Sequence, residues 1–277
     1  MIPAKFDYHR PASLAEATAL LSRHGEEANL LAGGHSLIPM MKLRMAAPEH
    51  LIDLQDIAEM KGISREGDRV VIGAMTTQAE LIGDAGLAEA LPILREAALQ
   101  IADPQVRYVG TVGGNVANGD PGNDMPGLMQ CLGAVYELAG PDGTREVAAR
   151  DFYESAYVTA RAESEILTRI AVPLPGAGTG WAYEKQKRKI GDYATAAAGV
   201  LVWPGGASVA MTNLSDRPVW SEAAGAKLAA GDVDGAVAAV LSEIEPVEDM
   251  RGPPEFKRHV AGVILRRAIA RAQSRAA

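Results

Sequence analysis

Two short glycine-rich segments carry the residues best suited to chemistry in this sequence. The first is Ala32-Gly33-Gly34-His35-Ser36, and the second is Thr111-Val112-Gly113-Gly114-Asn115. Paired glycines lack Cβ atoms and can adopt positive φ, so successive backbone amides are able to converge on an anion. Hydroxyl and amide side chains at the ends of the segments supply further polar partners. Together, two such loops are able to hold a diphosphate from two sides.

An ordinary tight turn is the alternative interpretation of each glycine pair. Neither segment matches GxGxxG or GxxxxGK[ST], so the sequence supports neither a Rossmann nor a P-loop nucleotide site. A short helix predicted over 37–45 would add its N-terminal amides and dipole to the first segment. Spacing alone leaves the phosphate site and the turn open.

Metal and nucleophile chemistry is not indicated by local spacing. There is one cysteine, Cys131, so an intrachain disulfide and an all-cysteine cluster are excluded. The five histidines show no HxH or HxxxH spacing; they are His9, His24, His35, His50 and His259. We therefore expect metal chemistry to lie on another polypeptide, and we predict no metal ligand and no catalytic residue in this chain.

The bulk composition is that of an ordinary globular protein. The 277 residues are 48% apolar and 22% charged, and the length suggests two domains. The net charge of −8 argues against nonspecific binding to nucleic acid. The first residues have no apolar stretch of the signal-peptide kind, and the longest largely apolar run, 194–204, is too short for a membrane span. We expect a cytoplasmic protein.

The first glycine segment lies in a predicted order of helix, strand, loop, helix and strand. Ser13 and Glu16 form a capping box that begins a helix, and Gly25 is its predicted stop. An apolar strand is predicted at 29–32, directly before the loop, and another at 51–54. This arrangement would aim the first segment out of a sheet edge.

Further elements are predicted around and beyond the second segment. A strand at 69–74 and a helix at 87–101 precede it, and Asp103-Pro104 breaks that helix. The later predictions are a helix at 126–132, a hairpin of 135–138 with 146–148, strands at 166–172, 181–187, 194–203 and 207–212, and helices at 221–230, 233–244 and 254–275. Strands and helices do not alternate strictly, so we predict the α+β class.

The clearest linker is the Pro- and Gly-rich stretch 173–180. It predicts a domain at 1–177 and a C-terminal domain at 178–277. The first domain is expected to have two lobes that meet near 55–60.

Several motifs in one order resemble a known family. Besides the two glycine segments, these are Gly119–Pro126, Tyr183–Lys185 and Lys187–Ala194. They resemble the FAD-binding subunits of the molybdenum hydroxylases, which include xanthine dehydrogenase and carbon monoxide dehydrogenase, and the resemblance is closest to medium subunits of the carbon monoxide type. It implies a two-lobed FAD-binding fold followed by a small antiparallel sheet with a helical cluster. The region 202–213 is shorter than the family pattern.

The resemblance also assigns roles to residues. It implies that 32–37 and 111–115 hold the FAD diphosphate, and that Asp124 faces ribose or ribityl hydroxyls. Leu167 would pack beside adenine, Lys185 would lie near the flavin ring and favour the reduced anion, and Tyr193 would cover one ring face. The structural alternatives are a loop-capping aspartate, a core leucine, a lysine on a solvated strand face and a core tyrosine.

The family holds its flavin noncovalently, so we expect noncovalent FAD. Some distant flavoenzymes attach FAD to histidine in a Gly-Gly-His loop, which makes His35 the alternative attachment point. Cys131 lies in an apolar stretch and is predicted to be inert.

The implied function is an electron relay. A large partner subunit would carry molybdenum, a small partner would carry iron–sulfur clusters, and this chain would pass electrons from FAD to an external acceptor. The resemblance implies a dimer of heterotrimers, either cytoplasmic or peripheral at the inner membrane face. The alternatives are a standalone FAD-dependent oxidoreductase and a nonredox nucleotide-binding assembly module. The sequence fixes neither the substrate nor the final acceptor.

Overall fold

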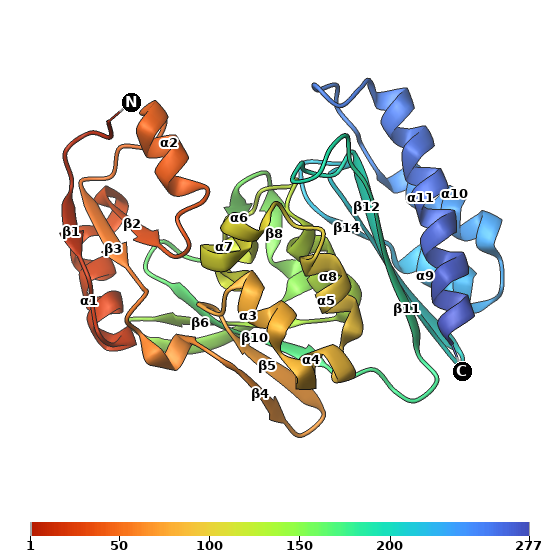
Figure 1. Ribbon diagram of the computed structural model, residues 1–277, viewed down its shortest axis with the longest axis horizontal. Coiled ribbons are helices and arrows are strands. Elements are labelled where there is room, and N and C mark those ends of the chain that lie inside the picture. Colours follow the sequence, from red (N-terminus) through yellow and green to blue (C-terminus); the bar gives the residue numbers. More distant parts are fainter. Residues whose placement is uncertain (1, 277) are drawn as a thin grey trace.

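The computed structural model describes residues 2–276 and is elongated, with three parts in a row (Figure 1). A small N-terminal lobe lies at one end, a five-stranded sheet with its helices lies in the middle, and a four-stranded sheet with the C-terminal helices lies at the other end. The predicted α+β class is confirmed.

The N-terminal lobe is a three-stranded parallel sheet with two helices. The strand order is β1 (Asp7–His9), β3 (His50–Asp53) and β2 (Ala28–Leu31). Helix α1 (Leu14–His24) connects β1 to β2 and packs on the sheet. Helix α2 (Leu37–Leu43) begins directly after the first glycine segment. The sheet therefore aims this segment out of the carboxyl end of β2.

Helix α1 begins and ends where the sequence predicts, although Glu16 binds the amide of Ala12 and not that of the cap residue Ser13. The Ser13 hydroxyl accepts from the Glu16 amide at 3.2 Å, and the Glu16 carboxylate accepts from the amide of Ala12 at 3.0 Å. Gly25 ends the helix with φ of +51°, which glycine adopts without strain. The buried side chains of this helix are Ala17 and Leu21.

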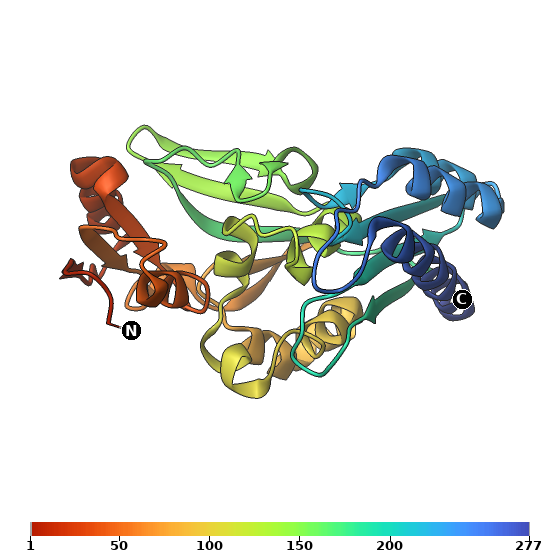
Figure 2. The same cartoon turned by 90° about the horizontal axis from the view of Figure 1, so that it is seen from above.

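The central sheet is antiparallel throughout. Its order is β4 (Ile63–Glu66), β5 (Arg69–Gly73), β10 (Ile166–Pro173), β6 (Val135–Gly140) and β7 (Gly143–Ala148). The predicted hairpin is confirmed as β6 and β7. Figure 2 shows the helices of this part, in yellow, gathered on one side of the sheet. The large hydrophobic core lies between them and the sheet.

The helices before the second glycine segment are shorter than predicted. Instead of one helix over 87–101, there are α4 (Ala85–Ala90) and α5 (Pro92–Ala98), preceded by α3 (Gln78–Gly83). Proline has no amide hydrogen to donate, so Pro92 begins a new helix at its first position.

The second glycine segment also differs from prediction, because it is helical. Asp103 caps α6 (Pro104–Val109), and the Thr111 hydroxyl caps α7 (Val112–Ala117) by accepting from the Gly114 amide. The glycine pair is therefore the first turn of a helix rather than a loop. Helix α8 (Asp124–Leu132) follows and packs beside α7.

The C-terminal part is a four-stranded antiparallel sheet covered on both faces. One face packs on α8, and the other packs on the C-terminal helices through a second hydrophobic core. The strands, in sheet order, are β11 (Gly180–Gln186), β12 (Ala196–Trp203), β13 (Gly206–Thr212) and β14 (Val219–Trp220). The helices are α9 (Glu222–Ala229), α10 (Val233–Glu243) and α11 (Pro254–Arg275).

A small two-stranded sheet completes the fold, with β8 (Tyr153–Ser155) paired to β9 (Val158–Thr159). The tight β12–β13 turn follows Trp203, in the region predicted to be short. Of the helices in residues 2–276, none has the length and apolar character that a membrane crossing requires.

Candidate functional site

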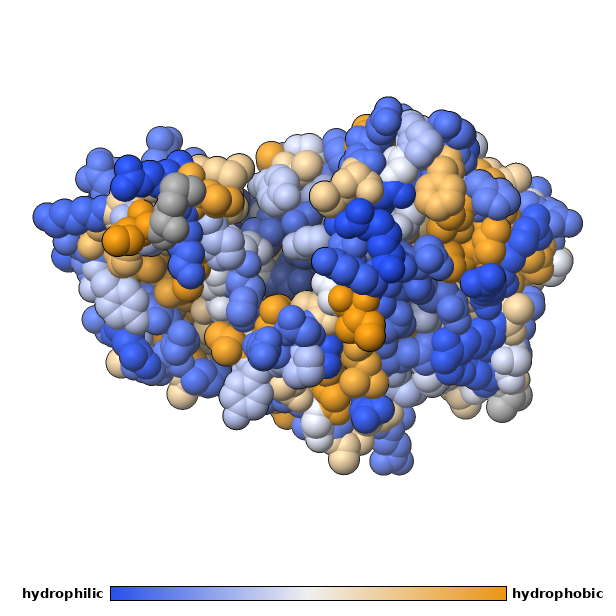
Figure 3. Space-filling model, turned by 45° about the horizontal axis from the view of Figure 1, so that its top comes forward, coloured by the Kyte–Doolittle hydropathy of each residue, from blue (hydrophilic) through white to orange (hydrophobic). Residues whose placement is uncertain are grey.

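The two glycine segments lie against each other, although 78 positions separate Gly33 from Thr111 in the chain. A Cβ atom on Gly33 would lie 2.6 Å from the Val109 carbonyl oxygen and 3.0 Å from the Thr111 nitrogen. A Cβ atom on Gly114 would lie 3.2 Å from the Ala32 Cβ. Only glycine permits this approach at Gly33, and a side chain at Gly114 would crowd Ala32. Figure 3 shows the surface hollowed between the N-terminal lobe, on the left, and the rest of the molecule.

The first segment presents amides to this region. Within the described part of the chain, no protein group accepts a hydrogen bond from the amides of residues 33–36. The Ile38 amide is already helical and donates to the Gly34 carbonyl at 3.0 Å. Ser36, at the cap of α2, makes no side-chain capping bond. Successive unpaired amides before a helix form an anion-binding group.

The amides of the second segment are instead used to fix α7 in place. Val112 and Gly113 donate to carbonyls in 74–76 at 2.8 and 2.9 Å. Gly114 donates to the Thr111 hydroxyl at 3.0 Å. Hydrogen bonds to the 74–76 segment of the central part therefore fix the conformation of the second glycine segment. The second segment can contribute to a ligand site in two ways. It lies close to the first segment, and it is followed by a polar side chain.

That side chain is Asn115. Its Oδ1 atom is buried without a hydrogen-bond partner among the described residues, whereas its backbone carbonyl accepts from Asn123 Nδ2 at 2.9 Å. Buried acceptors are almost always satisfied. This unsatisfied acceptor directly follows Gly114, which lies against the first segment, and together with the free amides it fits a ligand with both hydroxyl groups and phosphate oxygens.

Asp124 follows Asn123 and forms a buried ion pair. Lys185 Nζ lies 2.7 Å from its carboxylate, and the exposed fractions of the two side chains are 1% and 4%. The Tyr183 hydroxyl donates to the same carboxylate at 2.5 Å. Burial, and then the Asp124 charge, raises the pKa of Tyr183 well above its usual value. The interpretation of Lys185 as a solvated lysine is therefore wrong, because its side chain faces inward from β11.

A second ammonium group lies close to this pair. Lys187 Nζ donates to the Gln100 carbonyl at 3.2 Å, and Lys185 Nζ donates to the same oxygen at 3.3 Å. Burial, followed by the charge of Lys185, lowers the pKa of Lys187. Two positive groups on one carbonyl favour a negative charge nearby.

Tyr193 lies at the surface, 42% exposed, and is not a core tyrosine. The Arg251 guanidinium carbon is 5.6 Å from its ring centre. The preceding residue, Asp192, accepts from Arg188 at 3.0 Å and from Arg251 at 3.2 Å. A Cβ atom on Gly122 would lie 3.0 Å from the Tyr193 ring. The loop that carries Tyr193 is thus fixed beside the segment that leads into Asp124.

One predicted site residue, Leu167, lies apart from this set. Leu167 is 4% exposed and belongs to the large hydrophobic core, beside an irregularity in the pairing of β10 with β6. His35 is exposed, with its ring near Gly110. Leu37 is the first residue of α2.

Sequence reasoning missed three contributors to the site. Tyr183 and Lys187 stand within motifs already noted but were given no role, and Asn123 joins Asn115 to Asp124. The available signal for Lys187 was its position two residues after Lys185. Alternate residues of a strand share a face, so the two lysines were expected to point the same way.

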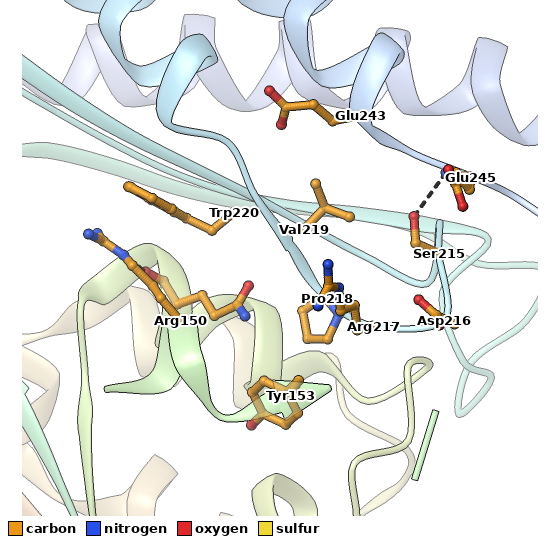
Figure 4. Close-up of a pocket in the computed structure, with 11 residues that line it drawn as sticks. Arg150, Tyr153, Ser215, Asp216, Arg217, Pro218, Val219, Trp220, Glu243 and Glu245 are labelled. Carbon is orange, nitrogen blue, oxygen red and sulfur yellow. Dashed lines mark hydrogen bonds between the residues drawn. The ribbon is translucent and has the colours of Figure 1, made fainter. Parts of the chain in front are cut away.

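A second hollow, of about 390 Å³, lies between β8 and the segment leading to β14 (Figure 4). The Arg150 guanidinium lies over the Trp220 ring at 3.7 Å, and the Glu245 amide donates to Ser215. None of the predicted site residues is among those that line it.

The free amides lie where the two glycine segments meet, and a connected row of residues, Asn115, Asn123, Asp124 and Lys185, runs from the second segment to the C-terminal sheet. These features fit a bound anion that also carries hydroxyl groups.

The comparisons identify the family. Residues 4–175 match the FAD binding domain in molybdopterin dehydrogenase, and residues 181–272 match the CO dehydrogenase flavoprotein C-terminal domain. The chain is 58% identical to the carbon monoxide dehydrogenase medium chain of Afipia carboxidovorans, over 100% of this chain and 99% of that protein. It is 46% identical to the medium chain of Hydrogenophaga pseudoflava, over the full length of both.

Solved structures agree with this assignment. A chain of the Cu,Mo-CO dehydrogenase in its cyanide-inactivated form superimposes with a TM-score of 0.97 at 58% identity, with all of both chains covered. A chain of quinoline 2-oxidoreductase from Pseudomonas putida 86 superimposes with a TM-score of 0.93 at 31% identity, with 99% of each covered. The chain belongs to the FAD-binding flavoprotein family of the molybdopterin dehydrogenases, within the carbon monoxide dehydrogenase flavoproteins.

Proposed function

We propose that this chain is the FAD-carrying medium subunit of an aerobic carbon monoxide dehydrogenase and transfers electrons to an external acceptor. The observation that carries the proposal is the pairing of unpaired amides at 33–36 with the second glycine segment at a distance that only glycine allows. The full-length similarity to carbon monoxide dehydrogenase medium chains supports carbon monoxide as the substrate of the complex.

Residues of both lobes would hold FAD noncovalently. The amides of residues 33–36 would bind the diphosphate, with Ser36 and Leu37 at the start of α2 and Thr111 to Asn115 opposite. Asn115 Oδ1 needs a donor, which a ribityl or ribose hydroxyl supplies. The Asp124 carboxylate already accepts from Tyr183 and Lys185 and retains capacity for a hydroxyl.

Lys185 and Lys187 provide positive charge at the far end of the row. Bound FAD supplies the capacity to collect electrons singly and release them to an acceptor. The lysines would lower the free energy of a negative charge on the bound ring. Tyr193 would restrict access to that ring from the surface, and Leu167 would back the adenine from within the core.

The remaining assignments extend the similarity to medium chains of carbon monoxide dehydrogenase. We propose a large partner subunit with the molybdenum cofactor and a small partner with iron–sulfur clusters, assembled as a dimer of heterotrimers in the cytoplasm. We also propose that 1–177 is the FAD-binding domain, divided into lobes near 55–60, and that 178–277 is the C-terminal domain. The chain leaves the parallel sheet after Asp53 and enters the antiparallel sheet at Ile63, which supports the lobe boundary.

Flavin analysis tests the cofactor assignment. The complex should contain one FAD per medium chain, and acid precipitation should leave the flavin in the supernatant. Flavin that remains on the pellet would reject noncovalent binding and make His35 the attachment point. A colourless chain that cannot be reconstituted with FAD would favour a nonredox assembly module.

Anaerobic rapid mixing tests the relay. The isolated chain loaded with FAD should not reduce its flavin when carbon monoxide is added, whereas the assembled complex should. Reduction in the isolated chain would replace the relay with a standalone oxidoreductase.

A further inference from the structure

We propose that the N-terminal lobe carries a mononuclear site for a divalent transition metal of the zinc class, formed by His9, His24 and His50. One nitrogen atom from each imidazole lies within 4.8 Å of the other two. The sequence predicted no metal ligands because these residues are 15 and 26 positions apart and local spacing cannot show the cluster. The site is separate from the glycine segments and does not depend on the function proposed above.

The fold brings the ends of three elements to one place. His9 ends β1 and His50 begins β3. The parallel register pairs Asp7 with His50 and His9 with Ile52. His9 and His50 are therefore two register positions apart on the same face of the sheet. Helix α1 packs against β3, and His24 is its last residue.

The distances suit ligands of one ion. His9 Nε2 and His50 Nδ1 lie 3.0 Å apart. Tetrahedral zinc with Zn–N bonds of about 2.0–2.1 Å places ligand nitrogens about 3.3 Å apart. This pair is hydrogen-bonded at a slightly shorter separation, and His24 lies beside it, with its ring centre 3.6 Å from that of His50. Side-chain rotation would bring the three nitrogens onto one ion in place of the shared proton. All three side chains are half-buried, so water can complete the coordination.

Arg23 and Glu27 are charged neighbours of His24, and their opposite charges offset each other. His24 also lies at the C-terminal end of α1, where the helix dipole favours a cation.

Zinc titration of the tag-free, chelator-stripped full chain tests the site. At about pH 7.5, where imidazole is mostly neutral, a chromophoric competitor should report one zinc equivalent per chain. His9→Gln, His24→Gln and His50→Gln should each weaken that binding by about tenfold or more. His35→Gln and His259→Gln remove exposed histidines outside the cluster and should leave it unchanged.

Cobalt provides a second readout that needs no variant. Co²⁺ bound to wild type in a tetrahedral field should absorb strongly in the visible region, whereas octahedral Co²⁺ absorbs weakly. Circular dichroism verifies that each variant is folded, and His24→Gln changes only the end of a helix. Equal zinc affinity of wild type and the folded His24→Gln chain, or a weak octahedral cobalt spectrum, would overturn the proposal.

Discussion

Lys185 belongs to a buried ion pair on which the stability of the fold should depend. Its ammonium group neutralises a buried carboxylate, and side-chain exposure is only 1% for Lys185 and 4% for Asp124. Lys185→Met leaves that carboxylate without its ion-pair partner, so the free energy of unfolding should fall by about 3–5 kcal/mol. Urea denaturation of the flavin-free chain measures the change.

Two further variants separate charge from packing. Lys189→Met removes an exposed lysine of the same segment and should change stability little. Asp124→Asn combined with Lys185→Met removes both charges and should recover much of the loss. If Lys185→Met were as stable as Lys189→Met, the ion pair would have no structural importance.

Cys131 yields a pH prediction. Burial raises the pKa of its thiol from 9.0 to about 12. The folded state therefore disfavours the thiolate, and the unfolded chain loses this proton at lower pH than the folded chain does. The contribution to stability is complete below about pH 9 and declines as pH rises towards 12.

The measurement compares wild type with Cys131→Ala in urea at two pH values. Between about pH 7.5 and pH 10, wild type should lose roughly 1 kcal/mol more than the alanine variant. Comparing pH differences cancels the cost of the cavity itself. Identical pH dependence in the two proteins would mean that the thiol ionises in the folded state.

At the scale of elements, the contact between the glycine segments is the feature most sensitive to substitution. A Cβ atom on Gly114 would lie 2.8 Å from Thr111 Oγ1 and 3.2 Å from Ala32 Cβ. Gly114→Val should therefore disturb the Thr111 cap of α7 and crowd the first segment. FAD affinity should fall at least tenfold, which corresponds to about 1.4 kcal/mol.

Gly83→Val is the matched control, because Gly83 is also helical and a Cβ there would meet nothing within 4 Å. FAD titration by fluorescence quenching should show wild-type affinity for this control, with circular dichroism near wild type for both variants. If the folded Gly114→Val chain bound FAD with wild-type affinity, the second segment would have only a structural role.

The sequence predicted helices and strands better than it predicted the boundaries and connections between them. The start of α1 was predicted because the Ser13 cap involves only residues that are close in the sequence. The helix at Val112 was missed because glycine lowers helix propensity by about 1 kcal/mol per residue. Bonds from Val112 and Gly113 to carbonyls in the 74–76 segment outweigh that cost. No local pattern contains such long-range partners.

The same reason limits prediction of the site. Glycine pairs with polar flanks pointed to both segments, and the family resemblance pointed to Asp124 and Lys185. The ion pair between these two side chains could not be predicted, because 61 positions separate them in the sequence. Their pairing depends on how α8 packs on the C-terminal sheet. The histidine cluster was hidden in the same way.

For the whole molecule, Glu96 joins the central part to the C-terminal helix. Its carboxylate on α5 accepts from Arg271 at 3.2 Å and from Arg275 at 3.1 Å, both on α11. Glu96→Gln should weaken this junction and lower the free energy of unfolding by roughly 1 kcal/mol, since the arginines are partly exposed.

Limited proteolysis and urea denaturation would detect the loosened helix. Glu89→Gln, at an exposed position one helix earlier, is the control for removing one negative charge. Equal proteolysis of the two variants would show that apolar packing alone holds α11 in place.

The hollow between the N-terminal lobe and the rest of the molecule has a consequence for the life of the protein in a cell. A ligand that contacts both walls stabilises the folded state in proportion to the logarithm of its free concentration. Chains that lack the nucleotide would open more often at this junction and be degraded sooner. The amount of this protein should therefore follow the supply of riboflavin, even when its messenger RNA does not change.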